Sequence, residues 1–258
     1  MSFHKKLPGG SPSSQIRESP YLLQQITLVI EQDPYNAVPI AHRGTLHLRM
    51  SQYDQALADF NRAIELSPFD ADIYGSRGNT YHELGLHLES VADYTRAIEI
   101  DPGSVMHFLN RANCYADVKN YEAALGDFER VFDLDPDYAE AYSNRGTIYM
   151  DLRNFDMALA DFNKAVELDP SYPNAYRNRG RLYINLGRFR EAVKDLSETI
   201  RLTPAFRADD FFFRGHAYTS LAQYDEARSD FAQALELDPQ SPLASQYVAE
   251  ILRTFGRR

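Results

Sequence analysis

The residue types that bind metals or perform catalysis are present in this chain, but their spacing matches none of the common site patterns. No histidine lies in an HExxH pattern, and the single cysteine has no second cysteine at metal-binding spacing. The chain has neither a GxGxxG segment nor a phosphate loop ending in Gly-Lys, which are the common nucleotide-binding motifs. The 37 Asp and Glu residues give no isolated pair suited to general acid and base chemistry. We therefore expect no enzyme activity, no metal site and no cofactor. The histidines considered are His4, His42, His47, His82, His87, His107 and His216.

Charge and composition argue against two further classes of function. The formal net charge of −10 repels the phosphates of nucleic acids and anionic lipids. No run of 18 apolar residues could cross a membrane, and residues 1–19 lack the apolar segment of a secretory signal. The single cysteine, Cys114, cannot form an internal disulfide and is interpreted as a small core residue. We expect a cytoplasmic protein that neither binds nucleic acid nor inserts into a membrane.

Proline recurs every 34 residues and marks the end of a repeated unit. Each proline follows a stretch such as ADFNKAVELDP, whose apolar residues recur at the spacing of an amphipathic helix. A second helical stretch, for example residues 139–152, lies between successive prolines. Helices of about 13 residues are marginal in water on their own, so they must pack against each other and against the next unit. The prolines are Pro34, Pro68, Pro102, Pro136, Pro170 and Pro204, and the last step, to Pro239, is one residue longer.

Small and large residues alternate at fixed places of each unit. In the first helix the small residue is followed three positions later by a ring: Gly44 and His47, Gly78 and Tyr81, Ala112 and Tyr115, Gly146 and Tyr149, Gly180 and Tyr183, Gly215 and Tyr218. In the second helix Ala56, Ser90, Ala124, Ala158, Ala192 and Ala227 precede Phe60, Tyr94, Phe128, Phe162, Leu196 and Phe231. This pattern resembles the tetratricopeptide repeat over most of the chain. The resemblance implies an all-α, right-handed superhelical α-solenoid of helix-turn-helix repeats whose first helices line a concave groove that binds proteins.

The repeat register predicts the domain organisation. We expect a flexible tail at residues 1–19 and capping helices at 20–34 and 240–258, because the outermost repeats need their apolar faces covered. The six repeats are expected at residues 35–68, 69–102, 103–136, 137–170, 171–204 and 205–239.

Each repeat has an arginine directly before the small residue of its first helix and an aspartate 16 residues later. The tetratricopeptide repeat usually has an apolar residue in place of this arginine. We expect an ion pair that joins the two helices of one repeat; the alternative is a basic stripe for an anionic ligand. The arginines are Arg43, Arg77, Arg111, Arg145, Arg179 and Arg214, and the aspartates are Asp59, Asp93, Asp127, Asp161, Asp195 and Asp230.

Asparagines on the expected concave face are the first candidate binding residues. Asn110, Asn144 and Asn178 lie two residues before the small residue of their repeats, and Asn79 and Asn113 lie one residue after it. A side-chain amide can donate to and accept from a peptide bond at once. The ladder is similar to the one that grips an extended peptide in the repeat region of the enzymes that add N-acetylglucosamine to proteins. The alternative is that these amides contact only water.

Two further pairs are candidates for the same face. Arg177 and Arg181 flank Asn178 at i and i+4, where they could hold an acidic side chain or a carboxylate, or else be solvated. In the run of three phenylalanines at 211–213 the first falls on the usual core position. Phe212 and Phe213 are then expected to form an apolar anchor at the groove, or to pack against the C-terminal cap.

These observations favour a non-catalytic scaffold or adaptor that binds an extended peptide or a helix of a partner protein in its groove. The alternative is a structural or assembly protein that self-associates as a homo-oligomer through its ends or through Phe212 and Phe213. A third possibility is a regulatory subunit of an enzyme on another chain, which the sequence does not distinguish from the first.

Overall fold

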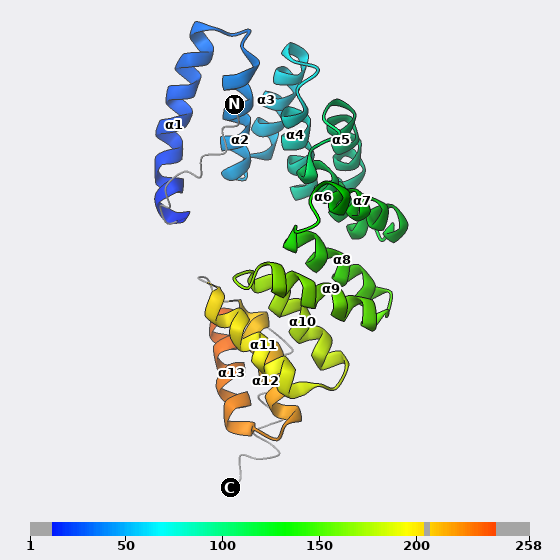
Figure 1. The fold of residues 1–258 in the computed structure, drawn as a ribbon. Coiled ribbons are helices and arrows are strands. Elements are labelled where there is room, and N and C mark those ends of the chain that lie inside the picture. Colours follow the sequence, from blue (N-terminus) through cyan, green and yellow to red (C-terminus); the bar gives the residue numbers. More distant parts are fainter. Residues whose placement is uncertain (1–11, 204–206, 241–258) are drawn as a thin grey trace. The chain divides into compact units, whose positions relative to one another are not determined.

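The computed structural model describes residues 12–203 and 207–240, with only the backbone described for 12–19. All regular elements in these ranges are α-helices (Figure 1), so the predicted all-α solenoid is confirmed. The helices are α1 (Pro12–Gln32), α2 (Ala37–Arg49), α3 (Tyr53–Leu66), α4 (Ala71–Glu83), α5 (His87–Ile100), α6 (Val105–Asp117), α7 (Tyr121–Leu134), α8 (Ala139–Asp151), α9 (Phe155–Leu168), α10 (Pro173–Asn185), α11 (Phe189–Leu202), α12 (Ala208–Ser220) and α13 (Tyr224–Leu237).

Helices α2 to α13 pair in chain order into six hairpins, and each hairpin lies within one of the expected repeat ranges. The turn inside each hairpin passes through the left-handed region at one residue. In the second hairpin this residue is Gly85, with φ 72°, and the turn is closed by backbone bonds from Gly85 N to His82 O and from Leu86 N to Tyr81 O, at 2.8 and 2.9 Å. This is the bonding pattern of a Schellman motif, which ends a helix sharply. The residues at the corresponding positions of the other turns are Ser51, Lys119, Arg153, Gly187 and Ala222.

The N-terminal helix is longer than expected. Helix α1 begins at Pro12, inside the segment expected to be a flexible tail, and has Pro20 in its interior. Proline suits the first turn of a helix because its missing N–H would have no partner there, so the sequence offers two acceptable starting points. The expected C-terminal capping helix, residues 240–258, lies outside the described residues apart from Gln240.

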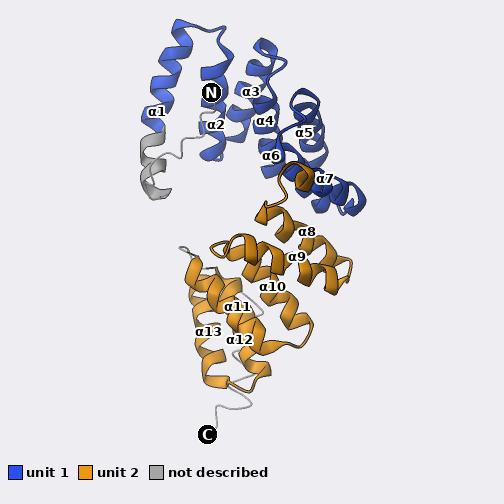
Figure 2. Cartoon of the chain, viewed as in Figure 1, with its two compact units in different colours: residues 1–130 blue, residues 131–258 orange. Residues whose placement is uncertain are grey.

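The chain divides into two compact units, residues 1–130 and 131–258 (Figure 2). Within each unit, the ring or leucine of a second helix packs directly on the small residue of the first. A Cβ atom added at Gly44 in unit 1 would lie 2.9 Å from Phe60, and one added at Gly146 in unit 2 would lie 2.7 Å from Phe162. Both phenylalanines are fully buried. The expected small-to-large alternation therefore sets the close approach of the paired helices.

All six arginine–aspartate pairs form the ion pair that the sequence predicts. In each pair arginine Nε and Nη2 donate to the two carboxylate oxygens, at 2.6 to 2.9 Å. The six aspartates are only 3 to 7% exposed. The arginines are therefore committed to these carboxylates, and the alternative of a free basic stripe is wrong.

The same arginines also join neighbouring repeats. Arg77 lies between the rings of Tyr74 and Tyr81, with its guanidinium carbon 5.7 and 5.8 Å from their centroids. Its remaining terminal nitrogen, Nη1, donates to Asn61 Oδ1 on α3 at 2.6 Å. Equivalent bonds to the second helix of the preceding hairpin, or to α1 for the first hairpin, run from Arg43 to Thr27, Arg111 to Thr95, Arg179 to Asn163 and Arg214 to Ser197.

Candidate partner-binding site

The asparagines expected to bind a peptide lie on first helices, and they already bond within the chain. Asn79 Oδ1 accepts a hydrogen bond from Tyr94 Oη at 2.5 Å and a longer one from Asn110 Nδ2 at 3.5 Å. Asn113 and Asn144 are half-buried and also have partners within the chain. These side chains therefore contribute to packing, in addition to any contact with a partner.

Asn178 links two first helices of unit 2. Its amide nitrogen on α10 donates to Ser143 Oγ at 3.1 Å and to Thr147 Oγ1 at 3.4 Å, both on α8. The donor is used in these bonds, whereas the amide oxygen points to no described partner. An oxygen of this kind can accept from the backbone N–H of an extended segment.

Arg177 and Arg181 do not form the expected pair. Arg177 is buried, and its Nε and Nη2 donate to the two oxygens of Asp210 on α12, at 2.5 and 2.9 Å, while Nη1 donates to Asn174 Oδ1. Arg181 is exposed, and its guanidinium carbon lies 5.0 Å from the centroid of the Phe213 ring. Their i, i+4 spacing placed them on one helix, but it gave no sign that Asp210, 33 residues further on, neutralises one of them.

Phe212 and Phe213 also separate in their roles. The two rings meet edge to face at 5.5 Å, and Phe212 lies 5.8 Å from Phe231 in the core of the last described hairpin. Phe212 therefore contributes to the packing of α12 against α13, while its expected role as an apolar anchor at the groove stays a prediction. Phe213, half-buried beside Arg181, remains the candidate contact on this side of unit 2.

Two clefts beside first helices have acidic linings that the site prediction did not include. In unit 1 a cleft of about 260 Å³ lies between α2 and α4, with Asp70 and Asp72 on one side and His42 on the other. In unit 2 a cleft of about 320 Å³ is lined by Glu140 at the start of α8 and by Asp169 and Tyr172 before α10. The clefts place carboxylates where a partner's side chain could enter.

Glu140 is the most distinctive of these acids. Its side chain is half-buried, and burial raises the pKa of its carboxyl group above the ordinary value. Within residues 12–203 and 207–240 it has no ion-pair or hydrogen-bond partner. A half-buried carboxylate without a counter-charge is stabilised when a cation approaches it.

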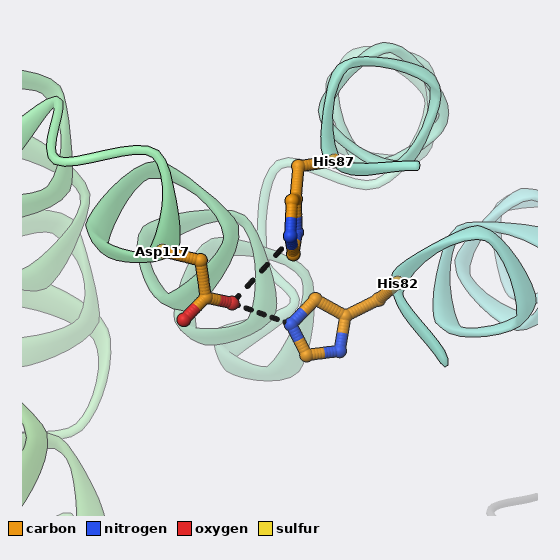
Figure 3. Close-up of side chains that lie close together, drawn as sticks. All are labelled: His82, His87 and Asp117. Atoms are coloured by element: carbon orange, nitrogen blue, oxygen red, sulfur yellow. Dashed lines mark hydrogen bonds and ion pairs between the residues drawn. The ribbon is translucent and has the colours of Figure 1, made fainter. Parts of the chain in front are cut away.

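The structure also brings together three residues that the sequence analysis did not connect: His82, His87 and Asp117 (Figure 3). They lie at the ends of α4, α5 and α6 that meet at one side of the second hairpin turn. The repeat pattern gave no signal for this cluster, because its three residues do not recur together at the repeat interval and come from two consecutive repeats.

Sequence models of the tetratricopeptide repeat match residues 43–105, 108–138, 139–172, 162–194 and 208–241. These segments include parts of all six hairpins. The chain belongs to the tetratricopeptide repeat family. No curated protein sequence matches it.

Solved structures of other tetratricopeptide repeat proteins share the fold at low sequence identity. A chain of the APC/C hetero-tetramer Cut9-Hcn1 superposes with a TM-score of 0.80 at 16% identity, over 91% of this chain but only 46% of that one. A tetratricopeptide repeat protein from Parabacteroides merdae gives 0.72 at 19% identity, over 95% and 100% of the two chains. PilW, a type IV pilus biogenesis factor, gives 0.73 at 19% identity, over 82% and 98%. The likeness establishes the fold and no individual activity.

Proteins of this family are in general protein-interaction scaffolds, and the repeats of this chain support that general role. Among the described residues, no helix combines the length and the apolar character that a membrane crossing requires.

Proposed function

We propose that this tetratricopeptide repeat chain is an adaptor that binds an extended, basic segment of a partner protein along the first helices of its hairpins. The observation that carries the proposal is the half-buried Glu140, unpaired among the described residues, in a cleft at the start of a first helix. A lysine or arginine from a partner would supply the missing cation, and the pair would form in a partly desolvated place where charge-assisted bonds are strong.

The cleft of unit 1 supports the same partner chemistry. Asp72 is exposed there, and Asp70 accepts a backbone bond from Asp72 N at 3.1 Å, which fixes its carboxylate at the start of α4. The apolar side chain of Val38, 56% exposed, lies in the same lining and could contact the aliphatic part of a lysine. An acidic cleft is thus present in each unit.

Asn178 would complement the acids by recognising backbone. Its amide oxygen can accept from a peptide N–H while its amide nitrogen stays bonded to α8. An acidic partner is disfavoured, because the arginine best placed to receive it, Arg177, is already paired with Asp210.

Arrays of twelve-residue peptides that vary net charge at constant length would test the proposal, followed by fluorescence anisotropy on the peptide that binds best. We expect that peptide to carry lysine or arginine, and we expect the double variant Asp72→Asn, Glu140→Gln to bind it at least tenfold more weakly. The matched control is Asp54→Asn, Glu226→Gln, which changes the net charge equally at exposed positions on the second helices α3 and α13. Preference for acidic peptides, or equal weakening by both double variants, would refute the proposal.

Self-association is the second candidate, and one observation favours it. The described part of α1 leaves Tyr21, Leu28 and Val29 exposed, at 65, 46 and 49%. Exposed apolar side chains close together are common at protein contacts. Light scattering over a concentration series distinguishes the candidates, because a chain that stays monomeric at all concentrations argues against self-association.

A further inference from the structure

His82, His87 and Asp117 point toward one another from three helices (Figure 3). Nε2 of His82 lies 2.7 Å from Oδ2 of Asp117, and Nδ1 of His87 lies 3.8 Å from the same oxygen. One nitrogen from each histidine and one carboxylate oxygen all lie within 4.8 Å of one another. Two imidazole nitrogens and a carboxylate oxygen thus converge on a single point.

Rigid elements hold this arrangement. His82 is in the last turn of α4, His87 is the first residue of α5, and Asp117 is the last residue of α6. The turn between the two histidines is closed by its backbone bonds and by the left-handed conformation of Gly85. The imidazole rings stand nearly edge to face, with centroids 5.5 Å apart. A site built on helix ends and a closed turn needs little reorganisation to bind a ligand.

One polar atom of the cluster lacks a partner. His87 Nδ1 is buried, yet it makes no hydrogen bond among the described residues, and 3.8 Å is too long for one to Asp117. A buried polar atom without a partner is rare in folded proteins and calls for an explanation such as a bound ion. A cation placed between the three side chains would coordinate this nitrogen.

We propose that His82, His87 and Asp117 bind a divalent transition-metal ion, with Zn²⁺ as the best match. Zn²⁺ binds imidazole nitrogen at about 2.0–2.1 Å and carboxylate oxygen at about 2.0–2.2 Å in tetrahedral geometry, which puts ligand atoms roughly 3.3–3.5 Å apart. The two separations of 2.7 and 3.8 Å lie on either side of this value. Mg²⁺ and Ca²⁺ prefer all-oxygen sites and do not fit two imidazoles.

The exposure of the cluster bears on how the ion would reach it. The side chains are 37, 29 and 47% exposed for His82, His87 and Asp117, so an ion can enter from solvent. Three protein ligands leave the fourth position of a tetrahedral ion open to water or to a donor from a partner. The bound ion would tie α4 and α5 of one hairpin to α6 of the next, which stabilises the folded state of unit 1 by mass action.

Equilibrium dialysis of the untagged full chain against Zn²⁺, after chelator treatment, tests the site directly. We expect one Zn²⁺ per chain, and at least tenfold weaker binding for His87→Asn and for Asp117→Asn. The control Asp54→Asn, matched to Asp117→Asn, removes an exposed carboxylate of the same unit outside the cluster and should bind like the original chain. Circular dichroism of each variant establishes that its helices are retained.

A second measurement needs no variant. Co²⁺ added to the metal-free chain should give the strong visible absorption of a four- or five-coordinate ion, and Zn²⁺ should displace it while Mg²⁺ should not. Weak, six-coordinate absorption would overturn the proposal. So would a chain that retains no Zn²⁺ in dialysis, or cluster variants that bind Zn²⁺ as tightly as the Asp54→Asn control.

Discussion

At the scale of single residues, the arginine before the small position shows how a charge can replace an apolar side chain in a packed repeat. The guanidinium of Arg77 is flat enough to lie between Tyr74 and Tyr81, and its nitrogens are satisfied by Asp93 and Asn61. The hydrogen bond to Asp93 raises the pKa of the Arg77 guanidinium above its ordinary value. A planar cation whose nitrogens are all bonded suits this half-buried position better than a lysine would.

Removing the counter-charge should be costly. Asp93 is 5% exposed, so Asp93→Asn leaves Arg77 half-buried with no compensating charge, and we expect a loss of about 3–5 kcal/mol in the free energy of unfolding. Urea denaturation followed by circular dichroism measures this loss. The control Glu99→Gln breaks the exposed pair with Arg96 on the same helix and should change the midpoint very little. Similar losses in the two variants would contradict the structural role of the buried pair.

The six recurring arginine–aspartate pairs could be predicted from the sequence, whereas the contacts at the candidate sites could not. Arginine and aspartate recur together six times, so their spacing alone predicts the contact. Arg177 with Asp210 and His82 with Asp117 each occur once, between consecutive repeats, and a single occurrence cannot be told from chance. The acidic clefts were missed for a related reason, since the burial of Glu140 depends on neighbours that lie far from it in sequence.

Glu140 should make stability depend on pH in an unusual direction. Because burial raises its pKa in the folded state, the folded chain holds a proton that the unfolded chain releases, so stability decreases as the pH rises from the ordinary Glu value of 4.5 through the folded-state pKa. Relative to the original chain, Glu140→Gln should become more stable across this window. The difference should vanish at lower pH, where both states are protonated. Urea midpoints of the two proteins at several pH values measure it, and a difference independent of pH would contradict the burial argument.

At the scale of elements, local signals in the sequence predict the helices more completely than they predict the candidate binding site. Proline and apolar periodicity predict where the paired helices lie, because each of these signals acts within one helix. The start of α1 escapes prediction because Pro12 and Pro20 are both compatible with a first turn. Contacts between helices depend on side-chain size at the crossing points, where Gly146 meets Phe162.

Two glycine substitutions should therefore have opposite effects. A Cβ at Gly146 would lie 2.7 Å from the buried ring of Phe162, so Gly146→Ala must separate α8 from α9 and should destabilise by roughly 1–3 kcal/mol. Gly126 lies within α7 with nothing near its Cβ position, so Gly126→Ala should stabilise by about 0.5–1 kcal/mol through helix propensity alone. Thermal unfolding measures both changes. Loss of stability in both variants would mean that close helix approach is not the cause.

At the scale of the whole molecule, each hairpin is matched to its neighbours and is not an interchangeable copy. A Cβ at Gly75 would lie 2.8 Å from His107 of the next hairpin, and burial lowers the pKa of that histidine. In unit 2 the corresponding contact is the ion pair of Arg177 with Asp210. The Gly75–His107 contact and the Arg177–Asp210 ion pair are not interchangeable, so hairpins exchanged between these two junctions would not fit their new neighbours.

Because helices contact mainly those of adjacent hairpins, damage to one hairpin should stay local. In unit 1, α4 and α5 contact α2, α3 and α6, so Asp93→Asn should speed amide hydrogen exchange in these five helices first. Helices α10 to α13 of unit 2 should keep their protection, since stability in a repeat stack is carried by neighbouring interfaces. Exchange followed by mass spectrometry resolves the helices separately. An equal rise in all described helices would instead show that the chain unfolds as one cooperative body, and the proposed metal site would then stabilise the molecule as a whole and not unit 1 alone.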